Sequence, residues 1–122
     1  MSKSILIVDD DRVSRTLYTR ILQHAGFSVH EAIDGADGLQ KAREITPDLM
    51  ILDLVLPKID GFTLCQTLRE EEDFARLPIF FISGRADKKM IERGFDSGAT
   101  DYLTKPIRRQ DLLMRIEATL SA

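Results

Sequence analysis

Polar residues suited to phosphate chemistry stand at the ends of separate apolar runs in this sequence. They are Asp9, Asp10, Asp11, Asp53, Ser83 and Lys105. Clustered carboxylates repel one another and attract a hard cation with oxygen ligands, which favours Mg²⁺. A hydroxyl and an ammonium group beside them add two partners for phosphate oxygens. If the fold brings these side chains together, the set predicts phosphate chemistry.

The elements that must position these residues can be read from the apolar pattern. Continuous apolar runs typical of strands buried on both faces lie at 5–8, 49–52 and 79–82, and weaker strand candidates lie at 27–32 and 102–104. Apolar residues at helical spacing follow each run, within 13–22, 39–45, 62–68, 90–95 and 112–120. Five strand–helix repeats predict an α/β domain with a parallel sheet and helices on both faces.

The predicted sheet would gather the polar residues at one edge. Ligands of an open parallel sheet bind outside the carboxyl ends of its strands, and the polar residues fall at those ends. Taken singly, Asp11 is best explained as the cap of the next helix, and Ser83 as a turn residue bonded to its own backbone. Lys105 alone would be an ordinary surface lysine. Their joint placement favours a functional cluster.

Length and composition restrict the class of protein. The chain has 122 residues, of which 43% are hydrophobic and 30% charged, as in ordinary globular domains. Acidic residues outnumber basic ones by 20 to 17, which disfavours direct binding to nucleic acid. The single cysteine, Cys65, excludes an internal disulfide. No apolar run approaches the ~18 residues of a membrane span, so we expect a cytoplasmic protein without membrane contact.

Four motifs resemble the CheY-like receiver domain of two-component response regulators. They are Val8-Asp9-Asp10, the stretch 53–61, the pair Ser83-Gly84 and the stretch 98–106. All four occur in order and at fitting separations, and the resemblance covers essentially the whole chain. It implies a (βα)5 flavodoxin-like, doubly wound parallel five-stranded sheet with strand order 2-1-3-4-5. It also implies one receiver domain over residues 1–122, with no output domain in the chain.

The resemblance assigns the acids. Asp53 is expected to be the phosphoacceptor, taking a phosphoryl group from a histidine kinase or a histidine phosphotransfer protein. Mg²⁺ is the expected cofactor, bound by Asp10, Asp53 and the backbone carbonyl of Val55. Asp9 would assist through a bound water. The protein would be a signalling switch that catalyses only its own phosphotransfer and dephosphorylation.

The resemblance also assigns the switch. Lys105 and Ser83 would contact the phosphoryl oxygens, and Tyr102 would turn inward as Ser83 moves. A cis peptide bond is expected between Lys105 and Pro106. The helix over about 88–97, the strand carrying Tyr102 and the last helix would form the face for a downstream protein. We expect the helix over about 88–97 to be mobile, because its apolar stripe is thin and Gly94 lies in its interior.

Two other functions remain open. The opening stretch 5–13 also resembles the first motif of haloacid-dehalogenase-like phosphatases, in which Asp9 would be the nucleophile. The order of the remaining acids and Lys105 disfavours that assignment. A pseudo-receiver that works without phosphorylation is disfavoured by the intact set of acids, serine and lysine.

Overall fold

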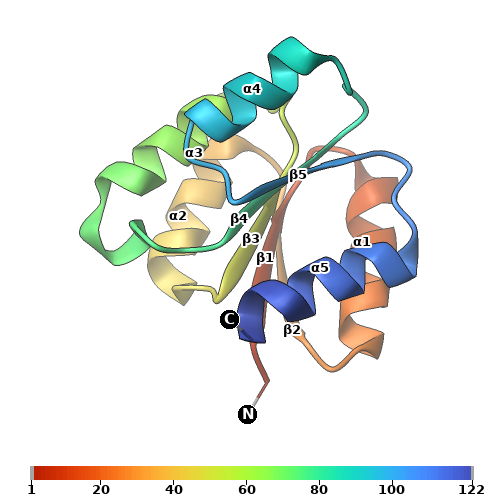
Figure 1. The fold of residues 1–122 in the computed structure, drawn as a ribbon. Coiled ribbons are helices and arrows are strands. Elements are labelled where there is room, and N and C mark those ends of the chain that lie inside the picture. The colour runs from red at the N-terminus through yellow and green to blue at the C-terminus, as the bar shows by residue number, and fades with distance from the viewer. Residues whose placement is uncertain (1, 122) are drawn as a thin grey trace.

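Strands and helices alternate along the computed structural model, which describes residues 2–121 (Figure 1). The strands are β1 (Ser4–Val8), β2 (Ser28–Ala32), β3 (Leu49–Leu52), β4 (Ile79–Ser83) and β5 (Asp101–Thr104). The helices are α1 (Arg12–His24), α2 (Gly35–Ile45), α3 (Gly61–Glu70), α4 (Lys88–Asp96) and α5 (Arg109–Ser121), with a 3-10 turn, η1 (Glu72–Phe74), before β4. The strands form one parallel sheet in the order β2-β1-β3-β4-β5, which confirms the predicted fold class.

Alternate residues of the strands pack on opposite faces of this sheet. In β1, Leu6 and Val8 join a core with residues of α2, α3 and α4, and Ile5 and Ile7 join a second core with residues of α1 and α5. Figure 1 shows the same division, with α1 and α5 on one side of the sheet and the other helices across it. All four of these side chains are fully buried, which is why the strand reads as a continuous apolar run.

Aspartates precede the first four helices, and three of them cap the helix that follows. The carboxylates of Asp11, Asp34 and Asp60 accept hydrogen bonds of 2.7–3.4 Å from amides in the first turns of α1, α2 and α3. The predicted capping role of Asp11 is therefore confirmed. Asp87 precedes α4 in a suitable extended conformation but makes no such side-chain bond within the described residues.

Turn regions show two further features at the carboxyl edge. The pair Asp34-Gly35 follows β2 and begins α2, and a Cβ at Gly35 would collide with the backbone carbonyl of Ile59. The peptide bond between Lys105 and Pro106 is cis, as expected.

No helix within residues 2–121 is long and apolar enough to cross a membrane.

Candidate functional site

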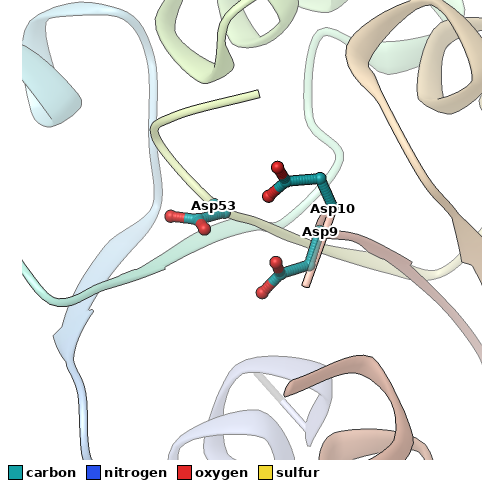
Figure 2. A group of neighbouring side chains, drawn as sticks. All are labelled: Asp9, Asp10 and Asp53. Carbon is teal, nitrogen blue, oxygen red and sulfur yellow. The ribbon is translucent and has the colours of Figure 1, made fainter. Parts of the chain in front are cut away.

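Three carboxylates meet where the two central strands end. Asp9 and Asp10 follow β1, and Asp53 follows the neighbouring strand β3. Their nearest carboxylate oxygens lie within 4.8 Å of one another, around a common space at this edge (Figure 2). Asp9 is buried, Asp53 is half-buried and Asp10 is exposed. The structure thus brings together three of the four acids that the sequence singled out, and the fourth, Asp11, caps α1.

Lys105 reaches this cluster from the end of β5. Its ammonium nitrogen lies 3.2 Å from Oδ2 of Asp9 and 3.6 Å from Oδ2 of Asp53. A third contact, which the sequence did not suggest, is the hydroxyl oxygen of Ser14 at 3.4 Å. The lysine backbone is fixed too, because its amide donates to the carbonyl of Ser83 at 2.7 Å. One ammonium therefore bridges residues from three separate elements.

Burial and nearby charge act in opposite directions on the pKa of Asp53 and on the pKa of Lys105. Burial raises the pKa of Asp53 above its ordinary value, although the nearby charge of Lys105 opposes the rise. Burial alone would lower the pKa of Lys105, but the charges of Asp53 and Asp9 outweigh it, so that pKa is raised. Lys105 accordingly stays a cation, and the cluster carries an excess of negative charge.

The backbone around the acids is held by specific hydrogen bonds. Oδ1 of Asp9 accepts from the amide of Asp11 at 2.9 Å, and Oδ1 of Asp53 accepts from the amide of Leu54 at 2.7 Å. Arg15, from the first turns of α1, donates to the backbone carbonyl of Asp9 at 2.8 Å and pairs with Glu31 of β2 at 3.2 Å. These contacts fix the chain directly after β1.

Ser14 and Arg15 are site residues that the motifs did not indicate. A signal was available, because α1 begins immediately after the acids and its first turn must pass the same edge of the sheet. Polar residues in that turn could have been added to the candidate set on this ground alone.

The hydroxyls of Ser83 and Tyr102 both bond the backbone of Arg85. The Ser83 hydroxyl accepts from the amide of Arg85 at 3.1 Å, and the Tyr102 hydroxyl donates to the carbonyl of Arg85 at 2.6 Å. Tyr102 is 8% exposed, so its ring is turned inward. Within residues 2–121 neither hydroxyl is hydrogen-bonded to the three acids. Val55, two residues after Asp53, has an exposed side chain.

The donor set fits a hard divalent cation. Three carboxylates face one ammonium, and the ligand atoms available from Asp9, Asp10 and Asp53 are all oxygens. Mg²⁺ prefers oxygen ligands from one or two carboxylates together with water. The exposed position of Asp10 leaves room for water on that side of the cluster.

Comparison with known proteins decides the family. Residues 5–117 match the response regulator receiver domain family. The chain belongs to this family. The receiver domain is 45% identical over 116 residues, or 95% of its length, to the DNA-binding dual master transcriptional regulator RpaA of Synechocystis sp.. That match covers 48% of RpaA, and the receiver domain spans about half the length of the curated relatives it matches.

Solved structures agree in fold over the whole receiver domain. A putative response regulator from Chloroflexus aurantiacus superposes with a TM-score of 0.96 at 36% identity, covering 100% of both chains. The receiver domain of the sensor histidine kinase PA1611 of Pseudomonas aeruginosa, solved with a magnesium ion coordinated in its active site cleft, gives 0.93 at 27% identity, also with full coverage. The chain is thus a CheY-like receiver domain of two-component signalling.

Proposed function

We propose that the receiver domain accepts a phosphoryl group on Asp53 from a histidine kinase or a histidine phosphotransfer protein. The observation that carries the proposal is the difference between two neighbouring carboxylates. The Asp53 side chain is 16% exposed and its Oδ2 is 3.6 Å from Lys105. The Asp9 side chain is 4% exposed and its Oδ2 is held by Lys105 at 3.2 Å. Of the two acids that Lys105 contacts, Asp53 is the one that a donor phosphate can approach more readily.

The transfer needs little covalent help from the protein. An oxygen of Asp53 forms a bond to phosphorus while the phosphorus–nitrogen bond of the donor phosphohistidine breaks. Lys105 lies beside both Asp53 and Asp9 and would meet the phosphoryl oxygens, where negative charge is concentrated. The product is an acyl phosphate that water hydrolyses, so the domain also resets itself. This chemistry serves signalling and makes the protein a switch.

Asp10, Asp53 and the backbone carbonyl of Val55 would hold Mg²⁺, and Asp9 would assist through a bound water. When bound, the ion would neutralise the repulsion between the carboxylates and the incoming phosphate. The close approach of the three acids supports this assignment, since without a counter-charge their mutual repulsion is unfavourable. Asp10, as the exposed member, provides the most accessible oxygen ligands.

The switch would run through the backbone of Arg85. A phosphoryl group on Asp53 would attract the Ser83 hydroxyl away from the Arg85 amide. The Tyr102 hydroxyl bonds the carbonyl of the same residue, so a shift of Arg85 would be felt by both switch residues. Tyr102 lies on β5, beside α4. We propose the face formed by α4, β5 and α5 as the docking site of a downstream protein, in the cytoplasm.

Intact mass measurement after incubation with acetyl phosphate and Mg²⁺ tests the acceptor. We expect the wild type to gain one phosphoryl group and Asp53→Asn to gain none. Asp60→Asn, which removes a carboxylate that caps α3, is the matched control and should be modified like the wild type. Modification that persists in Asp53→Asn but vanishes in Asp9→Asn would favour the phosphatase alternative. An unmodified wild type would favour a pseudo-receiver.

A further inference from the structure

Helix α1 supplies a hydroxyl to the lysine of the site. Ser14 lies in the first turn of α1, and its oxygen accepts a hydrogen bond from the Lys105 ammonium at 3.4 Å. The other two partners of that ammonium, Asp9 and Asp53, are carboxylates. Ser14 is therefore its neutral partner among the described residues.

The orientation of the Ser14 hydroxyl is set by Asp11. A serine hydroxyl has one hydrogen to donate and two lone pairs to accept with. The Ser14 hydrogen is directed to Oδ2 of Asp11, at an oxygen–oxygen distance of 2.7 Å. The lone pairs are thus left for Lys105.

We infer that Ser14 is a positioning residue for phosphoryl transfer, holding the Lys105 ammonium beside Asp53 while its carboxylate partners change. This inference rests on the proposed function. Before transfer Lys105 is bound by Asp9 and Asp53, and during transfer it must turn toward phosphoryl oxygens. A neutral acceptor keeps the nitrogen in place without competing in charge with the phosphate. Ser14 of α1 and Asp11, the cap of that helix, therefore form a hydrogen-bonded pair that supports the lysine directly after β5.

Three variants separate this role from a structural one. Ser14→Ala removes the acceptor, Ser14→Thr retains it, and Thr16→Ala removes an exposed hydroxyl elsewhere on α1. Ser14→Ala leaves the backbone amide that Asp11 caps, and alanine suits a helix, so folding should be preserved. We expect the maximal rate of phosphorylation by acetyl phosphate to fall about three- to tenfold in Ser14→Ala, as for loss of one hydrogen bond. The donor concentration at half-maximal rate should stay near that of the wild type, and Ser14→Thr and Thr16→Ala should resemble the wild type.

A spectroscopic measurement tests, without phosphorylation, whether Ser14 holds the Lys105 ammonium. Ammonium groups of lysines held in hydrogen bonds exchange their protons slowly and give ¹H–¹⁵N cross-peaks. We expect the Lys105 peak to be seen in the wild type, Ser14→Thr and Thr16→Ala, and to broaden or disappear in Ser14→Ala. An unchanged Lys105 peak and rate in Ser14→Ala would overturn the inference while leaving Asp53 as the acceptor. If the wild type is not phosphorylated at all, the proposed function fails, and the spectrum still decides whether Ser14 holds Lys105.

Discussion

Residues of similar chemistry lie in different surroundings in the receiver domain. Asp9 and Asp53 both follow apolar strands, but only the structure shows that Asp9 is bonded through both oxygens and that Asp53 is the more accessible. The sequence could place both acids at one edge, since parallel strands share their carboxyl ends. The apolar pattern alone could not rank them, because exposure depends on side chains from other elements, and only the resemblance assigned Asp53 as the acceptor.

The cysteine illustrates burial at the residue scale. Cys65 of α3 is fully buried in the core, and burial raises the pKa of its thiol. A raised pKa leaves less thiolate at any given pH, and the thiolate is the reactive form. We expect Cys65 to react with a thiol reagent at pH 8 at least about a hundredfold more slowly than an exposed cysteine, because reaction requires local opening.

The matched control for this reaction is the double variant Cys65→Ala with Gln66→Cys, which moves the thiol to the exposed neighbouring position. Its reaction should be fast in native buffer, and both proteins should react alike in denaturant. Fast native reaction of wild-type Cys65 would show that this part of the core opens readily.

At the scale of elements, α4 differs from α1, α2 and α3 in how it begins. The carboxylate of Asp87 lies 3.2 Å from the guanidinium of Arg85, in an exposed ion pair. Asp87 is therefore diverted from the amides of α4, whereas the aspartates before α1, α2 and α3 cap their helices. An exposed ion pair is worth roughly 0–1 kcal/mol, and a cap is worth about as much. Arg85 thus competes with the helix for its own cap.

Hydrogen exchange measures the consequence. We expect amides of residues 88–97 to exchange faster than those of α5, because Gly94 is the buried residue of α4 among those described, whereas α5 buries Leu112 and Ile116. Arg85→Ala should free Asp87 to cap α4 and slow exchange there about threefold to tenfold, the equivalent of ~1 kcal/mol.

The control for this change is Arg85→Ala combined with Asp87→Ala, in which no side chain is available to cap. Its α4 amides should exchange as fast as those of the wild type, or faster. If Arg85→Ala alone leaves α4 exchange unchanged, the competition between the ion pair and the cap does not operate.

Gly94 has a packing role that the sequence did not reveal. The pattern indicated only a helix weakened by glycine. In the structure a Cβ at this position would lie 2.9 Å from the Tyr102 ring and 3.3 Å from Phe81. Gly94→Ala should cost about 1–3 kcal/mol from overpacking, partly offset by ~1 kcal/mol of helix propensity.

The readout for Gly94→Ala is the exposure of Tyr102. The chain has two tyrosines and no tryptophan, and the other tyrosine, Tyr18, is buried in the opposite core. Iodide should therefore quench the tyrosine fluorescence more strongly when alanine displaces the Tyr102 ring. Unchanged quenching together with higher stability would show that the ring has room for the methyl group.

At the scale of the whole molecule, we expect the acidic cluster to oppose folding. Folding gathers Asp9, Asp10 and Asp53, whose charges the unfolded chain keeps apart. Mg²⁺ that binds the folded cluster should stabilise by RT ln(1 + [L]/Kd), about 2.7 kcal/mol at a hundredfold excess over Kd. Asp10→Asn should raise the metal-free melting temperature, by less than the equivalent of ~1 kcal/mol because Asp10 is exposed, and should weaken the response to Mg²⁺.

Thermal melts of both proteins with and without Mg²⁺ check this. Mg²⁺-free buffer with a chelator provides the reference state, and Asp60→Asn controls for the loss of an acid elsewhere. A wild type indifferent to Mg²⁺, with Asp10→Asn less stable than the wild type, would contradict the metal assignment.

The architecture was largely predictable, and the reason is physical. Strands β1, β3 and β4 are buried on both faces, so they appear in the sequence as continuous apolar runs. Strand β2 lies at the edge of the sheet and is only partly buried, which is why its signal was weak. The diverted cap of α4 could not be predicted, because Asp87 reads like the three aspartates that do cap.

The core between α1, α5 and the sheet joins segments from opposite ends of the chain. Tyr18 and Leu22 of α1 share it with Leu112 and Ile116 of α5. During synthesis on the ribosome, the apolar side of β1 and α1 must therefore wait for the last helix to emerge. The other core draws on α2, α3 and α4 and can assemble earlier. Nascent chains halted before Arg109 should consequently expose an apolar surface that chaperones bind, although all five strands have already been synthesised.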